Sequence, residues 1–167
     1  MTTPSGKFEF RIELPVRNEW DAIEKVRVSV MECFTTVFRD VQNSTAIANV
    51  AGELMENAVK YGHWSEEGNT HFLLRIWGDD AVAHIEVQSP VDPNAPELSE
   101  LLGTVAELRA ADNAADAYRR RLMDDARGAV GMSKLGLARV AYEGDCALEA
   151  EMVGGWVKVL ATTRLRT

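Results

Sequence analysis

The chain has 167 residues, of which 46% are hydrophobic and 26% are charged, a balance that predicts one globular domain over residues 1–167. Its formal net charge of −8 argues against nucleic-acid binding, because contacts with phosphates need clustered Lys and Arg side chains. No apolar run approaches the roughly 18 to 20 residues that span a bilayer, and residues 1–7 lack the apolar stretch of a signal peptide.

Hydrophobic periodicity predicts the elements in chain order. Alternating apolar residues indicate strands, and apolar residues at steps of three and four indicate helices. These patterns predict a strand over 8–14, helices over 20–41 and from Ser44 or Thr45 to Tyr61, strands over 70–77 and 81–89, a helical segment over 97–125 with a break near 112–113, a helix over 132–142, and strands over 146–152 and 156–163.

The order of these elements predicts an α+β fold. Helices segregate from hairpins along the chain, whereas a strict alternation of strands and helices would indicate parallel βαβ units. We therefore expect a two-layer sandwich in which a mixed, mainly antiparallel sheet is covered on one face by helices.

The segment over 90–130 is expected to form a loop and lid region. It begins with three prolines and then carries apolar residues at helical spacing, namely Leu98, Leu101, Leu102, Val105 and Leu108. Core packing is the expected role of this stripe, and a partner-binding face is the alternative that stays open.

A polar stripe marks the helix that ends at Tyr61. At about 100° per residue, Asn49, Glu53, Asn57 and Lys60 fall on one side of this helix, and its apolar residues fall on the other. Such a stripe has a defined chemistry: Glu53 could act as a general base, Asn57 could offer a neutral oxygen to magnesium, and Lys60 could meet a phosphate. A solvated helix face is the alternative interpretation.

Glycines precede the late helix that begins at Met132. Gly128 and Gly131 permit close approach of the backbone to a ligand, and the helix N-terminus presents free amides and a partial positive charge. Ser133 and Lys134 could add donors. These features are typical of a phosphate site, and a glycine-rich hinge before a core helix is the alternative.

The residues from Glu53 to Gly62 resemble the N-box of the histidine-kinase-like (Bergerat-type) ATPase superfamily, and Leu135-Gly136-Leu137 resembles its second glycine box. The sequence looks most similar to stand-alone bacterial anti-sigma-factor serine kinases and related switch proteins. The resemblance implies a Bergerat-type fold with ATP and Mg²⁺ as cofactors. It implies Glu53 as the catalytic base, Asn57 as the magnesium ligand, and phosphates near residues 128–136, including Gly136.

The sequence departs from the family pattern at its first glycine box. Ser89 stands where the family has the aspartate that recognises the adenine amino group, and Val91 stands where it has a glycine; Asp92 could substitute for the aspartate only if the loop shifts. Lys134 replaces a glycine of the second box. An adenine amino group without its acceptor costs on the order of 1 to 3 kcal/mol, or roughly 5- to 150-fold in affinity. The departures therefore predict ATP binding that is weak, altered or lost.

Two functions follow from these observations. The first is an ATP-binding switch protein, a possible serine/threonine kinase, that acts on a small partner protein. The second is a catalytically inactive pseudo-ATPase that regulates by protein–protein binding alone; a structural domain without a ligand is a third, weaker idea. The partner implied by the resemblance is an anti-anti-sigma-like protein or a sigma factor, and a homodimer is left open.

The two cysteines bear on the compartment in which the protein works. Cys33 and Cys146 stand in no C-x-x-C or metal-ligand spacing. Such isolated residues are expected to be buried thiols in a reducing compartment, which predicts a cytoplasmic protein.

Overall fold

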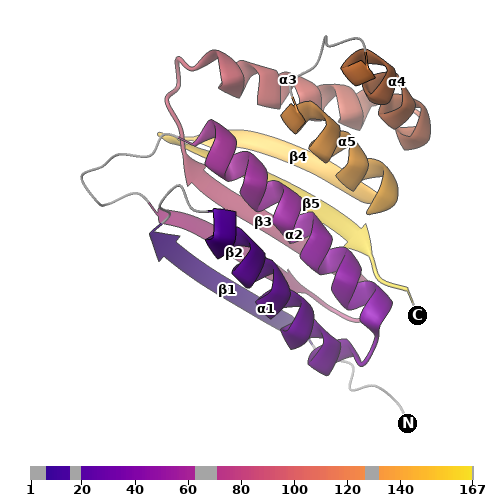
Figure 1. Ribbon diagram of the computed structural model, residues 1–167. Coiled ribbons are helices and arrows are strands. Elements are labelled where there is room, and N and C mark those ends of the chain that lie inside the picture. Colours follow the sequence, from indigo (N-terminus) through magenta and orange to yellow (C-terminus); the bar gives the residue numbers. More distant parts are fainter. Residues whose placement is uncertain (1–6, 16–19, 63–70, 127–131, 167) are drawn as a thin grey trace.

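A computed structural model describes residues 7–15, 20–62, 71–126 and 132–166. Within these ranges, ten elements follow one another (Figure 1). They are β1 (Phe8–Pro15), α1 (Trp20–Phe38), α2 (Val41–Tyr61), β2 (His71–Gly78), β3 (Val82–Pro90), α3 (Pro96–Ala110), α4 (Ala114–Ala126), α5 (Met132–Glu143), β4 (Cys146–Val153) and β5 (Trp156–Arg164).

The strands form one sheet with the order β1-β2-β3-β5-β4. All four pairings between the described strands are antiparallel, so the expectation of a mixed sheet was wrong. Two of these pairings, β2–β3 and β4–β5, join consecutive strands through tight turns. The β1–β2 pairing is antiparallel because α1 and α2 run along the sheet in opposite directions and return the chain to the end at which β1 finished.

The helices lie on one face of this sheet, and Figure 1 shows α1, α2 and α5 in front of the strands. The inward side chains of β2, β3 and β5, among them Ile76, Ile85 and Ala161, are fully buried together with Ile47 and Leu54 of α2. The predicted two-layer α+β sandwich is thereby confirmed. Among the described helices, none is long and apolar enough to cross a membrane.

A cluster of four phenylalanines fixes α1 to the edge of the sheet. Phe34 of α1 is 1% exposed, and its ring lies 5.4 Å from that of Phe8 and 6.1 Å from that of Phe10, both on β1. The ring of Phe38, also on α1, stacks on that of Phe34 with 5.4 Å between the ring centroids. Because α1 makes its main helix contact with α2, this cluster also sets the position of α2 over the sheet.

The boundary between α1 and α2 differs from the expected one. We expected one helix to reach Val41 and the next to begin at Ser44 or Thr45, but α1 ends at Phe38 and α2 begins at Val41. Arg39 has a positive φ of 53°, and the Asp40 side chain accepts a hydrogen bond from the Gln42 amide at 2.8 Å. Asp40 is therefore the N-cap. The Ser44 hydroxyl instead donates to the Asp40 carbonyl oxygen at 2.6 Å, inside the first turn.

The later helices agree with expectation. The helical segment over 97–125 is broken at residues 111–113 into α3 and α4. The apolar stripe of α3 packs inward, because four of its five residues, Leu98, Leu101, Val105 and Leu108, are buried and Leu102 is partly buried against the core. Core packing of this stripe is confirmed, and α3 lies against β4 and α5.

The two cysteines differ in exposure. Cys146 is buried, and loss of solvation raises the pKa of its thiol to about 12. Cys33 is exposed on α1, so the expectation that both thiols are buried was wrong for this residue. The residue type alone does not predict exposure, because a small, weakly polar thiol is tolerated at an exposed position of an amphipathic helix as well as in a core.

Candidate functional site

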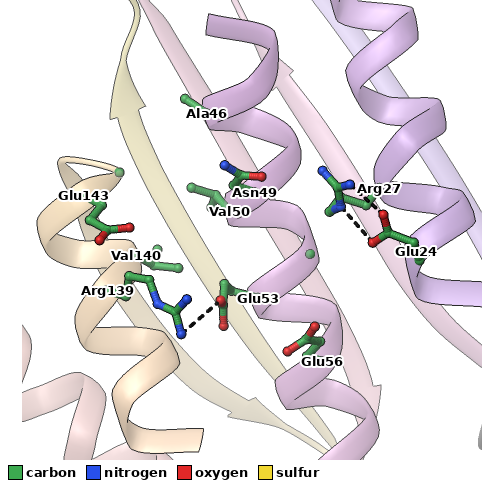
Figure 2. A pocket seen from close by; sticks show the side chains of 12 residues that line it. Glu24, Arg27, Ala46, Asn49, Val50, Glu53, Glu56, Arg139, Val140 and Glu143 are labelled. Atoms are coloured by element: carbon green, nitrogen blue, oxygen red, sulfur yellow. Dashed lines mark hydrogen bonds and ion pairs between the residues drawn. The ribbon is translucent and has the colours of Figure 1, made fainter. Parts of the chain in front are cut away.

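A groove of about 320 Å³ opens between α1, α2 and α5. Half of its lining residues come from α2, and α1 and α5 form its two walls. The residues that line it are Glu24, Arg27, Ala46, Asn49, Val50, Gly52, Glu53, Glu56, Arg139, Val140, Glu143 and Gly144. Figure 2 shows Glu53 and Arg139 pointing toward each other across the space between α2 and α5.

Glu53 occupies the middle of this groove. Its side chain is 23% exposed, and its Oε1 atom lies 3.7 Å from Nη2 of Arg139. Burial raises the pKa of the Glu53 carboxyl; Arg139 and Lys60 oppose this shift, while Glu56 and Glu143 add to it. A carboxyl group with a raised pKa in a groove is a candidate for proton transfer, although structural ion pairs perturb pKa values as well.

Gly136 allows α5 to approach this carboxylate closely. A Cβ atom at position 136 would lie 2.5 Å from Oε2 of Glu53, a distance that real Cβ atoms do not show. A larger residue at position 136, one helical turn before Arg139, would push the Glu53 carboxylate out of its present position. The structure thus brings together two of the residues that the sequence singled out, Glu53 and Gly136.

Asn57 lies in a different cavity from Glu53. Its side chain is buried, and Nδ2 donates a hydrogen bond to the Glu53 carbonyl oxygen at 2.9 Å. Asn57 and Ser89 line a cavity of only about 10 Å³ between α2, α3 and the sheet. The other residues around this cavity are Leu54, Ala58, Tyr61, Val87, Leu101, Val157 and Val159.

Of the other residues of the expected site, the structure describes Lys60 and Asp92. Lys60 is exposed near the end of α2. Asp92 is exposed in the turn after β3, where its Oδ1 atom accepts a hydrogen bond from the Asn94 amide at 2.9 Å. Lys134 belongs to α5, but its side chain lies outside the described part of the structure, as do Gly128 and Gly131.

The cavity that Asn57 and Ser89 line is too small in this structure to hold a purine ring. A volume of about 10 Å³ is close to the minimum for a single water molecule, far below what a purine ring needs. Leu101 of α3 is one of the residues that line this cavity, and the Asn57 amide already donates a hydrogen bond to the backbone. Among the described residues, no group of three or more His, Cys, Asp or Glu side chains is placed to hold a metal ion.

Sequence reasoning missed the cationic side of the groove. Arg139 follows Gly136 by three residues, which places both on one face of α5. The approach of Arg139 to Glu53 could therefore have been inferred once α2 and α5 were known to pack together. Arg27 donates two hydrogen bonds to Glu24 at 2.9 and 2.6 Å, an i,i+3 pair on α1. Nothing in the sequence of α1 indicates that this pair faces α2.

The raised pKa of Glu53 leads to a prediction about pH. A carboxyl whose pKa is higher in the folded than in the unfolded protein favours folding when protonated, and this contribution is lost as the pH rises through the folded pKa. We therefore expect Glu53→Gln to melt at nearly the same temperature as the wild type near pH 4 and at a higher temperature at pH 7. Thermal unfolding followed by circular dichroism across this range measures the difference. A melting difference that does not change with pH would contradict the assignment.

Two comparisons based on sequence, one with protein-family models and one with curated proteins, give no match. Comparison of the structure with solved structures does give matches. The fold is similar to that of a chain in the crystal structure of the SiaB–SiaC complex from Pseudomonas aeruginosa, with a TM-score of 0.63 and 15% sequence identity. The similarity covers 93% of this chain and 89% of that chain. At this identity the match establishes a shared fold.

Proposed function

We propose that this protein is a regulator that acts by binding a partner protein and does so without a bound nucleotide. The observation that carries the proposal is the cavity beside Asn57 and Ser89, which the protein's own apolar side chains reduce to about 10 Å³. The loss of the adenine-binding aspartate at Ser89 agrees with this. Similarity to a chain that was crystallised as part of a two-protein complex supports a partner protein as the ligand.

A second candidate, an ATP-dependent serine/threonine kinase that switches a small partner, is favoured by Glu53. This residue keeps a half-buried carboxylate whose pKa burial raises, a property expected of a general base. Asn57 is retained one turn further along α2. For this candidate to hold, the cavity beside Asn57 must first widen, for example by a movement of α3, which contributes Leu101 to its lining.

Calorimetry distinguishes the two candidates. We expect no measurable heat when Mg-ATP or Mg-ADP is titrated to millimolar concentration into the folded wild-type protein, because the cavity that Asn57 lines measures only about 10 Å³. Binding by the wild type that disappears in Asn57→Ala would instead support the kinase. Transfer of labelled phosphate to a co-purifying protein would then separate an enzyme from a nucleotide-gated scaffold.

Partner binding is tested with the same protein as bait. The proposed regulator should retain a small protein, of the anti-anti-sigma type or a sigma factor, from a lysate of its own source, and should retain it equally well with and without Mg-ATP. Reconstitution of the complex from the two purified proteins then confirms direct binding. Retention that requires Mg-ATP would favour the kinase, and failure to form a complex from purified proteins would contradict both candidates.

A further inference from the structure

The groove between α1, α2 and α5 has more acidic than basic side chains in its lining. Its charged residues are Glu24, Glu53, Glu56, Glu143, Arg27 and Arg139. Each arginine is paired with one carboxylate. Arg27 donates two hydrogen bonds to Glu24 on its own helix. Nη2 of Arg139 lies 3.7 Å from Oε1 of Glu53. The pairing leaves an excess of negative charge in the groove.

Glu56 and Glu143 carry this excess charge. Glu56 is half-buried on α2, and Glu143 is exposed on α5. Within the described ranges of the chain, neither side chain makes an ion pair or a hydrogen bond, and Figure 2 shows no such contact at either residue. Both are close enough to Glu53 to raise the pKa of its carboxyl, because like charges repel. Lys60 opposes this shift but does not line the groove.

Two glycines bring charged side chains of the groove close to a neighbouring helix. A Cβ atom at Gly52 of α2 would lie 3.0 Å from Cδ of Arg27. Gly136 of α5 has the corresponding place against the Glu53 carboxylate. Glycine is unfavourable inside a helix, yet both glycines lie in helix interiors at these contacts. Close helix packing therefore sets the positions of the charged side chains at two points of the groove.

The size and the charge of the groove favour an organic cation. Its volume of about 320 Å³ is at the lower end of the range for small-molecule pockets. The lining includes the short apolar side chains of Ala46, Val50 and Val140, against which the methylene chain of an arginine can pack. Among the described residues, no group of acidic side chains is placed to hold a metal ion. A guanidinium group, with five donors in a plane, can instead bridge carboxylates that lie apart.

We propose that this groove is the docking site for an arginine-bearing segment of the partner protein, whose guanidinium group lies among Glu53, Glu56 and Glu143. The proposal rests on the proposed function, regulation by partner binding, and adds the place and the chemistry of the contact. The net charge of −8 favours the approach of a basic segment, because complementary charge speeds encounter.

A short capped peptide with two arginines is the probe for this site. We expect its titration into the full chain at about 0.15 M salt, followed by amide NMR, to shift the signals of α1, α2 and α5 around the groove. The double variant Glu56→Gln/Glu143→Gln should bind the peptide roughly 2- to 30-fold more weakly, the effect of losing two exposed ion pairs. Its NMR spectrum shows whether the fold is retained. If it is not, Glu143→Gln alone, at an exposed position, provides the test.

Glu97→Gln/Glu100→Gln is the matched control. Both residues are exposed on α3, which does not line the groove. This double variant removes the same amount of negative charge, so the general attraction between a basic peptide and an acidic protein changes equally. We expect it to bind the peptide as tightly as the wild type does.

The outcomes separate the docking site from the proposed function. Equal weakening by the two double variants, or no binding by the wild type at millimolar peptide, overturns the docking site. It is also overturned if free spermidine binds in the groove and the peptide does not, since the ligand is then a small cation. In each of these cases, a complex formed from the two purified proteins still supports regulation by partner binding. Absence of that complex contradicts the proposed function, and the docking of a partner fails with it.

Discussion

Phe34→Ala should lower the free energy of unfolding by about 3 to 5 kcal/mol. Phe34 is 1% exposed and touches the rings of Phe8, Phe10 and Phe38, so truncation leaves a cavity between α1 and β1 that these three rings cannot fill. The loss is a large part of the roughly 5 to 15 kcal/mol that stabilises a typical domain. Urea denaturation followed by circular dichroism measures it.

Val37→Ala on the same helix is the control. Val37 is 46% exposed, and a surface substitution of this kind changes stability by about 0.5 kcal/mol or less. The position of α1 depends on the Phe34 cluster, and α1 forms one wall of the Glu53 groove. Equal losses for the two variants would show that the aromatic cluster does not fix α1 to the sheet.

Gly78→Ala should destabilise the protein by about 1 to 3 kcal/mol. A Cβ atom at Gly78 would lie 2.0 Å from the backbone oxygen of Val82 and 3.1 Å from Cα of Ala83. These are backbone atoms, so the clash cannot be relieved by turning a side chain, and the β2–β3 hairpin must open. The same Val82 oxygen accepts a hydrogen bond from the Asp79 amide at 3.0 Å, which the shift would weaken.

Gly103→Ala is also a glycine-to-alanine substitution, but it should raise the stability of the protein instead of lowering it. A Cβ atom there meets nothing within 4 Å, and the residue lies exposed in the middle of α3. Alanine restricts the unfolded chain and favours the helix, so we expect a gain of about 0.4 to 1 kcal/mol. Thermal melts of the two variants side by side give the comparison. A gain in stability for Gly78→Ala would refute the hairpin geometry.

Local patterns were sufficient to predict the elements of the fold. The alternation in the strands and the three- and four-residue steps in the helices do not depend on distant contacts, and the break at residues 111–113 was visible in the sequence. The boundary at Asp40 was missed because Asp40 and Ser44 are both good capping residues. Only the backbone path through Arg39 decides between them.

The candidate site was harder to predict than the fold. The polar stripe on α2 was visible, but a step of four residues rotates a side chain by about 40° around the helix. That rotation is enough to turn Glu53 toward α5 and Asn57 toward α3 and the sheet. Periodicity gives the angle between two side chains, whereas the neighbouring helices decide which cavity each one enters.

The residues that line the cavity beside Asn57 and Ser89 could not be predicted from a sequence motif. Leu101 is one of several leucines at core spacing on α3, and nothing in its local sequence distinguishes it from Leu98. Its place beside Asn57 depends on how α3 lies between β4 and α5. A resemblance that is carried by Glu53 and Asn57 therefore says little about whether a ligand can enter.

The pairing of β3 with β5 has a consequence for synthesis on the ribosome. Roughly 65 residues separate the end of β3 from the start of β5. At a translation rate of about 5 to 20 residues per second, the nascent chain carries one unpaired edge of β3 for about 3 to 13 seconds. During that interval β3, the most buried strand of the finished sheet, is exposed to other chains. The β4–β5 hairpin, which is synthesised last, is the element that pairs with this edge.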